Sequence, residues 1–452
     1  MHTYAKRRDR AVAGVAATLS DESPVVGLID LDLIDERAEE LRNAFRNDQP
    51  VLHTIAAKAI PLGAVLAQCA TRGMGCEVAS PGELELALAT GFSPENIVFD
   101  SPAKTVGDLR SALKLGVGIN FDNFTEVARF DEILAQADAL PENGMGLRIN
   151  PQLAPGSITA MSTATKISKF GVGLADEGTR EEIISTYLER SWMNQIHVHS
   201  GSQGMSLEQS ATAVRVIVEL ANEINDRSVQ LYGTRRVKRI DIGGGLPVNY
   251  YSDEVAPSYR EYRLILEELV PELFDYELVT EFGRSLAAKS GSILSRVEYV
   301  KKTGGRRIAT THAGVQVVTR TAYMPNDWPL RVIALTADGE RKTTPEELHD
   351  VAGPACFSGD LVAQATLLPR LDTGDTVLIP DTGAYCFTSH YSYNMLPRIP
   401  VLGYRQNGSE LEYFQLRKLQ TTEDVVAEAG PQEAPQIDPC SVRVGGAMAS
   451  SN

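Results

Sequence analysis

One lysine in the chain has the surroundings of a covalent catalyst. Lys58 ends the apolar run Val51-Leu-His-Thr-Ile-Ala-Ala-Lys58 and has alanine on either side. A lysine at the C-terminal mouth of a buried strand is poorly hydrated, which lowers its pKa and favours a neutral amine able to form a Schiff base. The small neighbours leave room for a bound ring. The alternative is an ordinary solvated charge at the end of a strand.

Two glycine-containing segments could hold an anion beside such a lysine. The triplet Gly243 to Gly245 follows a predicted strand, and backbone amides in a glycine loop can converge on a phosphate. The segment Glu281-Phe-Gly-Arg284 supplies an acid and a base. Glu281 could keep a pyridine nitrogen protonated, and Arg284 could bind a phosphate. Taken alone, the triplet is also typical of a tight turn and the acid and base of a surface ion pair.

Two histidines, His197 and His199, lie on one face of a predicted strand, because strand side chains alternate. A His-x-His pattern occurs in the metal sites of barrel hydrolases, which need further ligands at other strand ends. The remaining histidines do not occupy such positions. An aromatic surface against a planar cofactor therefore fits better than a metal, and one of the two can be a core histidine.

Two segments in the last quarter of the chain carry a thiol and a phenol. Cys356 lies in Gly353-Pro-Ala-Cys-Phe-Ser-Gly-Asp360, and a cysteine after Gly-Pro is usually buried packing. If it is exposed at the mouth of a site, its thiol is instead an acid able to deliver a proton. Tyr385, which follows Asp381-Thr-Gly-Ala, indicates first of all a packed tyrosine in a turn.

Short apolar runs alternate with helical segments through most of the chain. This alternation predicts a parallel sheet with right-handed crossovers, and eight runs predict a closed (β/α)₈ barrel. Functional residues in that fold lie at the C-terminal ends of the strands, which here carry Lys58, Arg148, His199, the glycine triplet and Glu281. The eight runs are residues 51–57, 75–80, 96–101, 118–123, 145–150, 195–202, 239–245 and 277–283.

The pattern changes beyond the predicted barrel. Strands at 292–301, 306–311, 330–335 and 376–379 are separated by turns rather than long helices, which predicts a β-rich domain. The basic, alanine-rich N-terminus favours a helix of the mature protein over a cleaved targeting peptide. We therefore expect an N-terminal arm (1–24), a barrel (25–288), a β-rich domain (289–425) and a disordered tail (426–452).

Composition excludes several classes of function. A net charge of −16 and an isoelectric point near 5.0 argue against nucleic-acid binding. No apolar run approaches the roughly 20 residues of a transmembrane helix, so a membrane protein is not expected. The five cysteines lack Cys-x-x-Cys spacing and indicate neither a disulfide framework nor a zinc ribbon. A reducing compartment, the cytoplasm, is the simplest expectation.

Taken together, these motifs resemble the barrel-type (fold type III) pyridoxal-phosphate decarboxylases, the family of diaminopimelate, ornithine and arginine decarboxylases, and diaminopimelate decarboxylase most of all. The resemblance covers most of the chain. The order and spacing of the motifs make the set far more specific than any one of them. The motifs are Lys58-Ala, Gly82-Glu-Leu, Arg148-Ile-Asn-Pro, Ser168-Lys-Phe-Gly, His197-Val-His-Ser-Gly-Ser-Gln, Gly243-Gly-Gly, Glu281-x-Gly-Arg, Gly353-Pro-x-Cys and Gly383-Ala-Tyr.

The resemblance implies a role for each matching residue. Lys58 would hold pyridoxal 5′-phosphate as an internal aldimine, His199 would stack on the ring, and Glu281 would pair with the pyridinium nitrogen. Loss of carbon dioxide would leave a quinonoid carbanion, which Cys356 of the partner subunit would protonate. A homodimer with shared active sites is therefore implied, and no metal. Further contacts to the cofactor, chiefly its phosphate, would come from Ser202, Gly243, Gly244, Gly245, Gly283, Arg284 and Tyr385.

Departures from the family pattern fall where the substrate would bind. Phe357 follows Cys356, where ornithine enzymes have aspartate and diaminopimelate enzymes have glutamate, so the acidic contact to a distal amine is missing. Arg320 matches an arginine that helps to hold the substrate, which is compatible with a carboxylate-bearing side chain. Tyr323 is offset by one position from the pattern. The residues implied in substrate binding are Arg320, Tyr323, Phe357 and Asp360.

We therefore expect a decarboxylase of a small amino acid, similar to diaminopimelate decarboxylase and acting on a substrate that the sequence does not name. One alternative is an amino-acid racemase on the same barrel and cofactor. Glu281 argues against it, because alanine racemases place an arginine against the ring nitrogen. The other alternative is an inactive regulatory homologue that resembles the antizyme inhibitors, but all the main motif residues are present here.

Overall fold

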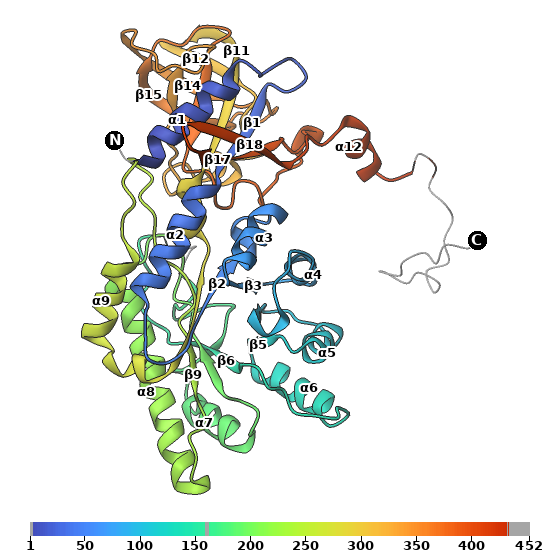
Figure 1. The fold of residues 1–452 in the computed structure, drawn as a ribbon, viewed down its shortest axis with the longest axis vertical. Helices are drawn as coiled ribbons and strands as arrows, with labels where there is room; N and C mark the ends of the chain where they lie inside the picture. Colours follow the sequence, from blue (N-terminus) through green and yellow to red (C-terminus); the bar gives the residue numbers. More distant parts are fainter. Residues whose placement is uncertain (1–2, 159–161, 432, 434–452) are drawn as a thin grey trace.

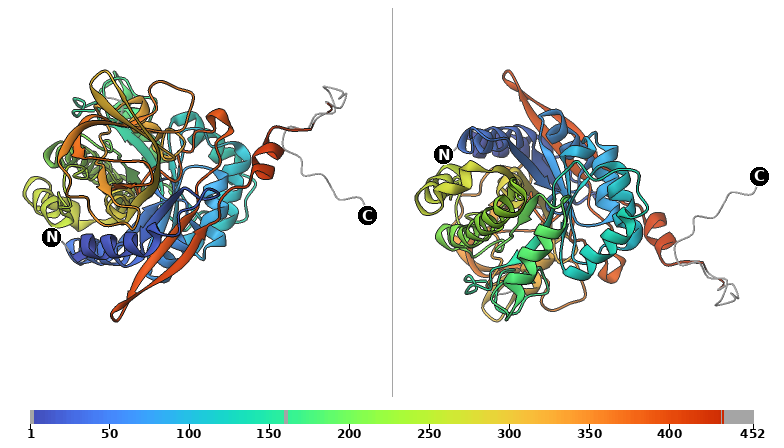
Figure 2. Two further views of the ribbon diagram at one scale, coloured as in Figure 1. Left: turned by 90° about the horizontal axis from the view of Figure 1, so that it is seen from above. Right: turned by 90° about the horizontal axis from the view of Figure 1, so that it is seen from below.

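The computed structural model describes residues 3–158, 162–431 and 433, which form two parts (Figure 1). The lower part in Figure 1 is a barrel of parallel strands, and the upper part is a β-rich domain. Viewed from below, helices surround the strands of the barrel (Figure 2). Two parts of this kind agree with the predicted fold class.

Eight parallel strands close the barrel in the order β5-β4-β3-β2-β10-β9-β8-β6, and β5 pairs with β6. Each strand coincides with one of the eight apolar runs, so the predicted (β/α)₈ barrel is confirmed. A two-residue strand, β7 (Val172–Gly173), extends β6 outside the ring. The barrel strands are β2 (Val51–Ala56), β3 (Gly75–Val78), β4 (Ile97–Asp100), β5 (Gly118–Phe121), β6 (Met145–Asn150), β8 (Gln195–His197), β9 (Arg239–Asp241) and β10 (Glu277–Phe282).

Capping residues set the ends of the helices around the barrel. The longest helix, α8, begins at a capping box formed by Ser206 and Gln209 and ends at Gly233, whose φ of +75° suits glycine. The apolar faces of the helices pack on the strands in one continuous core. These helices are α2 (Leu31–Ala44), α3 (Gly63–Thr71), α4 (Pro81–Ala89), α5 (Val106–Leu115), α6 (Phe124–Leu134), α7 (Thr179–Glu189), α8 (Leu207–Tyr232) and α9 (Tyr259–Leu269).

The β-rich domain is built on a second sheet of nine strands. Its strand β1 (Val25–Asp30) pairs with β11 (Gly291–Thr303) on one side and β17 (Val401–Asn407) on the other. We expected the strand at residue 25 in the barrel; it belongs to this sheet instead. A buried strand followed by a helix has the local pattern of a barrel unit, and only its pairing partners distinguish the two. The other strands are β12 (Arg306–Thr311), β13 (Ile333–Leu335), β14 (Glu346–Ala352), β15 (Leu361–Pro369), β16 (Thr376–Pro380) and β18 (Glu410–Arg417).

The predicted N-terminal helix is present as α1 (Thr3–Ala16) and packs on the second sheet. Its Val12 and Val15 share a small core with Leu28 and Leu294. At the other end, α12 (Thr422–Glu428) begins before the predicted tail and continues into it, and residues 432 and 434–452 of that tail lie outside the described residues. The short helical segments are α10 (Arg284–Ala287), α11 (Thr319–Tyr323) and the 3₁₀ turns Ala57–Ala59, Pro94–Asn96, Pro271–Asp275, Ala288–Ser290 and Tyr393–Met395.

Two expectations from composition can be compared with the structure. No helix within the described part of the chain is long and apolar enough to cross a bilayer. Cys69, Cys76, Cys356 and Cys386 are free thiols, and Cys440 lies outside the described residues. The thiols of the described residues therefore form no disulfide framework.

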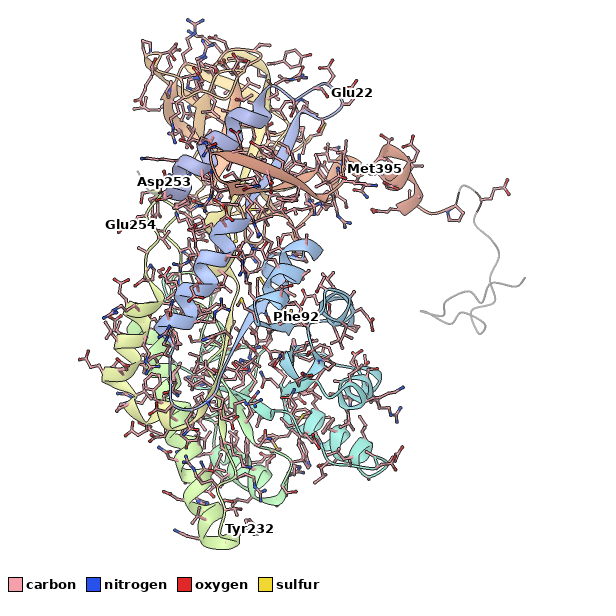
Figure 3. The ribbon with its side chains drawn as sticks, in the orientation of Figure 1. Glu22, Phe92, Tyr232, Asp253, Glu254 and Met395 are labelled. Atoms are coloured by element: carbon pink, nitrogen blue, oxygen red, sulfur yellow. The ribbon has the colours of Figure 1, made fainter. Side chains whose placement is uncertain are left out.

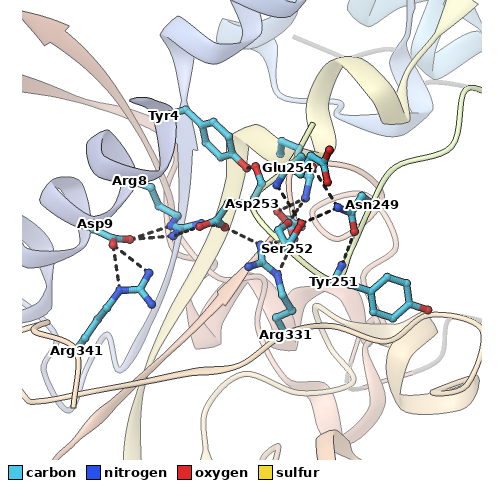
Figure 4. A network of polar contacts seen from close by, with 12 residues as sticks. Tyr4, Arg8, Asp9, Asn249, Tyr251, Ser252, Asp253, Glu254, Arg331 and Arg341 are labelled. Atoms are coloured by element: carbon cyan, nitrogen blue, oxygen red, sulfur yellow. Dashed lines mark hydrogen bonds and ion pairs between the residues drawn. The ribbon is translucent and has the colours of Figure 1, made fainter. Parts of the chain in front are cut away.

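A polar network joins the two parts of the molecule (Figure 4). Asp253, in the loop between β9 and α9, accepts hydrogen bonds from Arg8 of α1 at 2.9 Å and from Arg331 at 2.8 Å. Arg331 also donates to Asp381 at 2.8 Å. Figure 3 shows Asp253 at the level where the barrel meets the β-rich domain. The network fixes the loop that leads away from the glycine triplet.

Candidate active site

A cavity of about 470 Å³ opens at the C-terminal ends of the barrel strands, against the β-rich domain. Five cations and two anions line it, so it suits an anionic ligand; the cations are Lys58, Arg148, Lys169, Arg284 and Arg320, and the anions are Asp100 and Glu281. The predicted site residues found on its wall are Lys58, His199, Ser202, Gly245, Glu281, Gly283, Arg284, Arg320 and Tyr385.

Lys58 lies in the 3₁₀ turn that follows β2, with its side chain 39% exposed. Its Nζ donates to Oε1 of Glu77 at 2.5 Å, and Glu77 is fully buried on the neighbouring strand β3. Burial alone would lower the pKa of Lys58, but Glu77, Asp100 and Glu281 outweigh it and raise that pKa. The lowered pKa that we expected is therefore wrong for the free protein, because a carboxylate stands directly against the amine.

Glu281 lies on β10 with 4% of its surface exposed. Its Oε2 is 3.5 Å from Nε2 of His197, whereas Oε1 has no hydrogen-bond partner among the described residues. Burial raises the pKa of a carboxyl group, but His197 outweighs it and lowers the pKa of Glu281. An ionised carboxylate with a free oxygen therefore lies on the cavity wall.

His199 follows β8 and faces the cavity. Burial and the nearby Arg148 lower its pKa to about 3, so the imidazole is neutral. Its Nδ1 accepts a hydrogen bond from the backbone N–H of Gly244 at 3.1 Å, which leaves the proton on Nε2. The ring is thus held in one orientation as a neutral aromatic surface.

The glycine triplet contributes one residue to the cavity wall rather than three. The N–H of Gly243 donates to Oδ1 of Asp241 at 2.9 Å, and that of Gly244 is taken by His199. Both amides therefore have partners within the chain. Gly245 lines the cavity with φ +100°, and a Cβ there would lie 2.1 Å from the carbonyl oxygen of Gly201. Only glycine allows this close approach.

Arg284 begins α10 beside Gly245 on the cavity wall. Its Nε and Nη2 donate to Ser202 Oγ at 3.3 and 3.1 Å, and its Nη1 donates to the hydroxyl of Tyr250 at 3.0 Å. Tyr250 belongs to the loop that the Asp253 network fixes. The guanidinium and hydroxyl together form a donor group suited to phosphate.

The guanidinium groups of Arg320 and Arg284 both contact the rings of Trp328 and Tyr385. Trp328 lies 5.0 Å from the Arg320 carbon Cζ and 4.6 Å from that of Arg284, and the Tyr385 ring lies at 4.6 and 4.5 Å. Burial and Arg284 lower the pKa of Arg320, and its buried Nη1 has no hydrogen-bond partner among the described residues. Two adjacent cations with a free donor favour an anion between or beside them.

Besides Gly243 and Gly244, four predicted residues do not line this cavity, namely Tyr323, Cys356, Phe357 and Asp360. Cys356 is exposed, and Phe357 stacks on Tyr323 with ring centroids 5.1 Å apart. Asp360 is buried, and its carboxylate accepts the backbone N–H groups of Val315 and Ala355 at 2.5 and 2.8 Å. Within the chain, Asp360 therefore holds two loops together rather than facing a ligand.

Several residues at or behind the cavity wall were not among the predicted site residues. Asp100 and Arg148 line the cavity, whereas Glu77 lies behind it and contacts Lys58. Glu77 and Asp100 each lie in a short apolar strand, and a lone acid in such a strand is a signal that sequence alone could have supplied. Arg148 pairs with Asp100 at 2.9 Å and stacks on Phe170, with 4.5 Å between Cζ and the ring centroid. The buried acids thus hold both Lys58 and Arg148 at the cavity.

Comparisons with known proteins agree with this geometry. The family model of the pyridoxal-binding domain of pyridoxal-dependent decarboxylases matches residues 31–288. The diaminopimelate decarboxylase of Pseudomonas aeruginosa is 32% identical over 347 residues, which cover 76% of this chain and 79% of that enzyme. The enzyme of that name from Helicobacter pylori strain J99 is 28% identical over 401 residues, 88% of this chain and 93% of the relative. The crystal structure of the Helicobacter pylori enzyme with L-lysine superposes with a TM-score of 0.77 at 26% identity, covering 90% and 96% of the two chains.

Proposed function

The chain belongs to the fold type III pyridoxal-phosphate-dependent decarboxylases, and from this family membership we propose that it removes the α-carboxyl group of an amino acid in the cavity at the barrel mouth. One observation carries the proposal. A single cavity brings together the amine of Lys58, the carboxylate of Glu281, the ring of His199 and the guanidinium of Arg284. The amine could bind an aldehyde, the carboxylate could pair with a ring nitrogen, and the guanidinium could bind a phosphate. The imidazole offers an aromatic surface.

Pyridoxal phosphate fits the residues that are present. The cationic lining suits its phosphate, for which Arg284, Ser202, Tyr385 and the glycine edge at Gly245 would be the ligands. Its aldehyde would be held by the amine of Lys58. The free Oε1 of Glu281 is an acceptor for the protonated ring nitrogen. When bound, the cofactor supplies an electron sink for the electron pair left on Cα as carbon dioxide departs.

The residues of the chain prepare the site for that chemistry. Glu281 would hold a proton on the ring nitrogen, because it is ionised and buried. His199 stays neutral, so it supports a ring without adding a second charge beside Arg148. Glu77 fixes the amine of Lys58 in its protonated form, and that proton must leave before the amine can bond to an aldehyde.

The proton that replaces the carboxyl group would come from Cys356 of the partner subunit. In its own chain Cys356 is exposed and does not line the cavity, so a second copy is needed to bring the thiol to Cα. Two hydrogen bonds fix the loop that carries Cys356. The N–H of Cys356 donates to Asn394 Oδ1 at 2.7 Å, and the N–H of the preceding Ala355 donates to the carboxylate of Asp360. The hydroxyl of Tyr393 donates to the carbonyl oxygen of Cys356 at 3.3 Å, and the exposed side chains of Tyr393 and Met395 suit burial by a partner. We therefore propose a homodimer with shared active sites.

The substrate would carry a carboxylate at its distal end. Arg320 offers a buried, unpaired Nη1 beside the cavity, whereas Asp360 is occupied by backbone amides. Phe357 places an apolar ring next to Cys356, stacked on Tyr323, where it gives no contact to a distal amine. These features favour an acidic side chain over a diamine.

Release of carbon dioxide from a panel of amino acids tests the proposed function. The panel should contain diaminopimelate, ornithine, lysine, arginine and acidic amino acids, each with wild-type protein and with Lys58→Ala. We expect release from a carboxylate-bearing substrate and none from the variant. Proton exchange at Cα without carbon dioxide would indicate a racemase, and a protein that binds no cofactor would indicate a regulatory role. An exposed thiol at Cys356 also suits a reducing compartment, and we propose the cytoplasm.

A further inference from the structure

His197 lies beneath the cavity with no exposed surface. It is the last residue of β8 and stands two residues before His199, but it does not line the cavity. Neither of its ring nitrogens has a hydrogen-bond partner among the described residues. A buried polar ring without such partners is costly, unless nearby charges compensate for the loss of water.

Carboxylates from three other strands face this ring. Nε2 of His197 lies 3.5 Å from Oε2 of Glu281 on β10, and its Nδ1 lies 3.9 Å from Oδ1 of Asp100 on β4. Asp241 on β9 is the third, and both of its oxygens already accept hydrogen bonds. On β6, Arg148 pairs with Asp100 at 2.9 Å. Among the described residues, Glu281 forms no ion pair with any cation other than His197.

The charges of this cluster balance better when His197 is protonated. Asp100 and Glu281 place negative charge against the ring, whereas burial and Glu281 raise the pKa of Asp241 well above its usual range. Arg148 pairs with Asp100, and Lys58 lowers the pKa of Glu281 less than His197 does, so an imidazolium supplies the main positive charge beside Glu281. Burial lowers the pKa of a histidine, but Asp241, Asp100 and Glu281 outweigh it and raise the pKa of His197 to about 9. The effect is reciprocal, since His197 lowers the pKa of Glu281 against the effect of burial.

Resting on the proposed function, we propose that His197 is a positioning residue, a buried imidazolium that keeps Glu281 ionised and aimed at the ring nitrogen of the cofactor. Without this cation, only the weaker effect of Lys58 would oppose burial and the charge of Asp100, so the pKa of Glu281 would rise and the group would take up a proton more readily. A neutral carboxyl group would not hold a proton on the ring nitrogen. His197 thus acts on the cofactor through Glu281 and does not touch it.

The test compares two ligands that differ only at the ring nitrogen, pyridoxal phosphate and its 1-deaza analogue, which has carbon there. Dissociation constants are measured with full-length wild-type protein, His197→Gln and Glu281→Gln. We expect wild-type protein to favour pyridoxal phosphate by about tenfold, the scale of one charge-assisted hydrogen bond. Both variants should lose this preference, to within about twofold, while keeping affinity for the deaza analogue.

His53→Gln is the matched control. His53 is also a buried barrel histidine, on β2, but its Nδ1 pairs with the hydroxyl of Thr280 at 2.9 Å. Burial lowers its pKa to about 4, so it carries no charge. This variant should retain the preference for pyridoxal phosphate. If His197→Gln weakens both ligands equally, as a merely structural change would, the proposal is overturned.

A measurement on unaltered protein covers the case in which His197→Gln does not fold. Neutron diffraction at neutral pH should find a proton on both nitrogens of His197, and a bare nitrogen would overturn the proposal. Donor atoms of Asp100, His197 and Glu281 lie within 4.8 Å of one another, so bound metal is the competing explanation. One tightly bound metal ion per chain by elemental analysis would overturn the charge assignment. Wild-type protein that binds neither ligand would instead refute the proposed function itself.

Discussion

Nζ of Lys58 lies 2.5 Å from Oε1 of Glu77, a carboxylate with no exposed surface on the next strand of the barrel. The pairing sets two properties of the amine. It fixes the position of Nζ at the cavity wall, and it raises the pKa, so that Lys58 is an ammonium at neutral pH. An ammonium cannot attack an aldehyde, so cofactor capture by the free protein requires that this proton be lost.

Replacement of Glu77 should make that capture easier at low pH. Glu77→Gln removes the negative charge that raises the pKa of Lys58, so the pKa falls and the neutral amine is populated at lower pH. The rate of covalent capture of pyridoxal phosphate, followed by absorbance across pH, should shift to lower pH. Glu85→Gln, an exposed change on α4, is the control and should leave the profile unchanged. An unshifted profile in Glu77→Gln would show that this carboxylate does not govern the amine.

The close approach at Gly245 predicts a specific loss of cofactor affinity. Gly245→Ala combines a left-handed φ of +100° with a Cβ placed 2.1 Å from the Gly201 carbonyl oxygen, so the cavity edge must move. Affinity for pyridoxal phosphate should fall by about tenfold or more, which equilibrium titration measures. Gly91→Ala has a similar φ of +93° but open space around the added Cβ. It should cost about 1 kcal/mol of folding stability without changing affinity, and equal affinity losses in both variants would contradict the argument.

The Asp253 network should make the junction between the two parts sensitive to acid. Burial raises the pKa of Asp253, but Arg8 and Arg331 outweigh it and hold that pKa below its usual range. In the unfolded chain the group titrates near about 3.9, so its stabilisation is present above that pH and is lost as pH falls toward the folded pKa. Asp253→Asn should cost about 1–3 kcal/mol at pH 7 and less at pH 3.

Thermal unfolding at both pH values measures this difference. Asp21→Asn is the control, because Asp21 pairs with Arg296 while 89% of its side chain is exposed. Its effect should stay within about 0.5 kcal/mol at either pH. If the cost of Asp253→Asn did not shrink on acidification, the network would not act through the charge of Asp253.

Mixing of two inactive variants tests the shared active site. Lys58→Ala and Cys356→Ala should each lose decarboxylation, because one lacks the amine and the other the proton donor. Subunit exchange between them creates heterodimers in which one of two sites is complete. Activity should recover to about a quarter of the wild-type value under random pairing. An unchanged, inactive mixture in which mass spectrometry detects heterodimers would place Lys58 and Cys356 in separate functions.

The barrel could be predicted from the sequence because its strands are buried on both faces and therefore read as short apolar runs. Each of the eight runs became a barrel strand. The strand at residue 25 has the same pattern, and its pairing with β11 depends on a segment about 270 residues away. Sequence periodicity does not report such a partner.

The positions of the site residues could be predicted from motifs at the strand ends. Their charge states and hydrogen-bond partners could not, because these depend on neighbours from other strands. Lys58, His199 and Glu281 lie on one cavity as expected from their strand ends. The charge state of Lys58 depends on Glu77, which only the pairing of β2 with β3 brings into contact. The amides of Gly243 and Gly244 likewise have partners that only the fold reveals.

The central claim is that Lys58 is the covalent anchor of the cofactor. The direct measurement is borohydride reduction of protein loaded with pyridoxal phosphate, followed by peptide mass spectrometry to locate the label. We expect the pyridoxyl group on Lys58, and no stable label in Lys58→Ala. A label on another lysine of the cavity, Lys169, or no label on wild-type protein, would contradict the account.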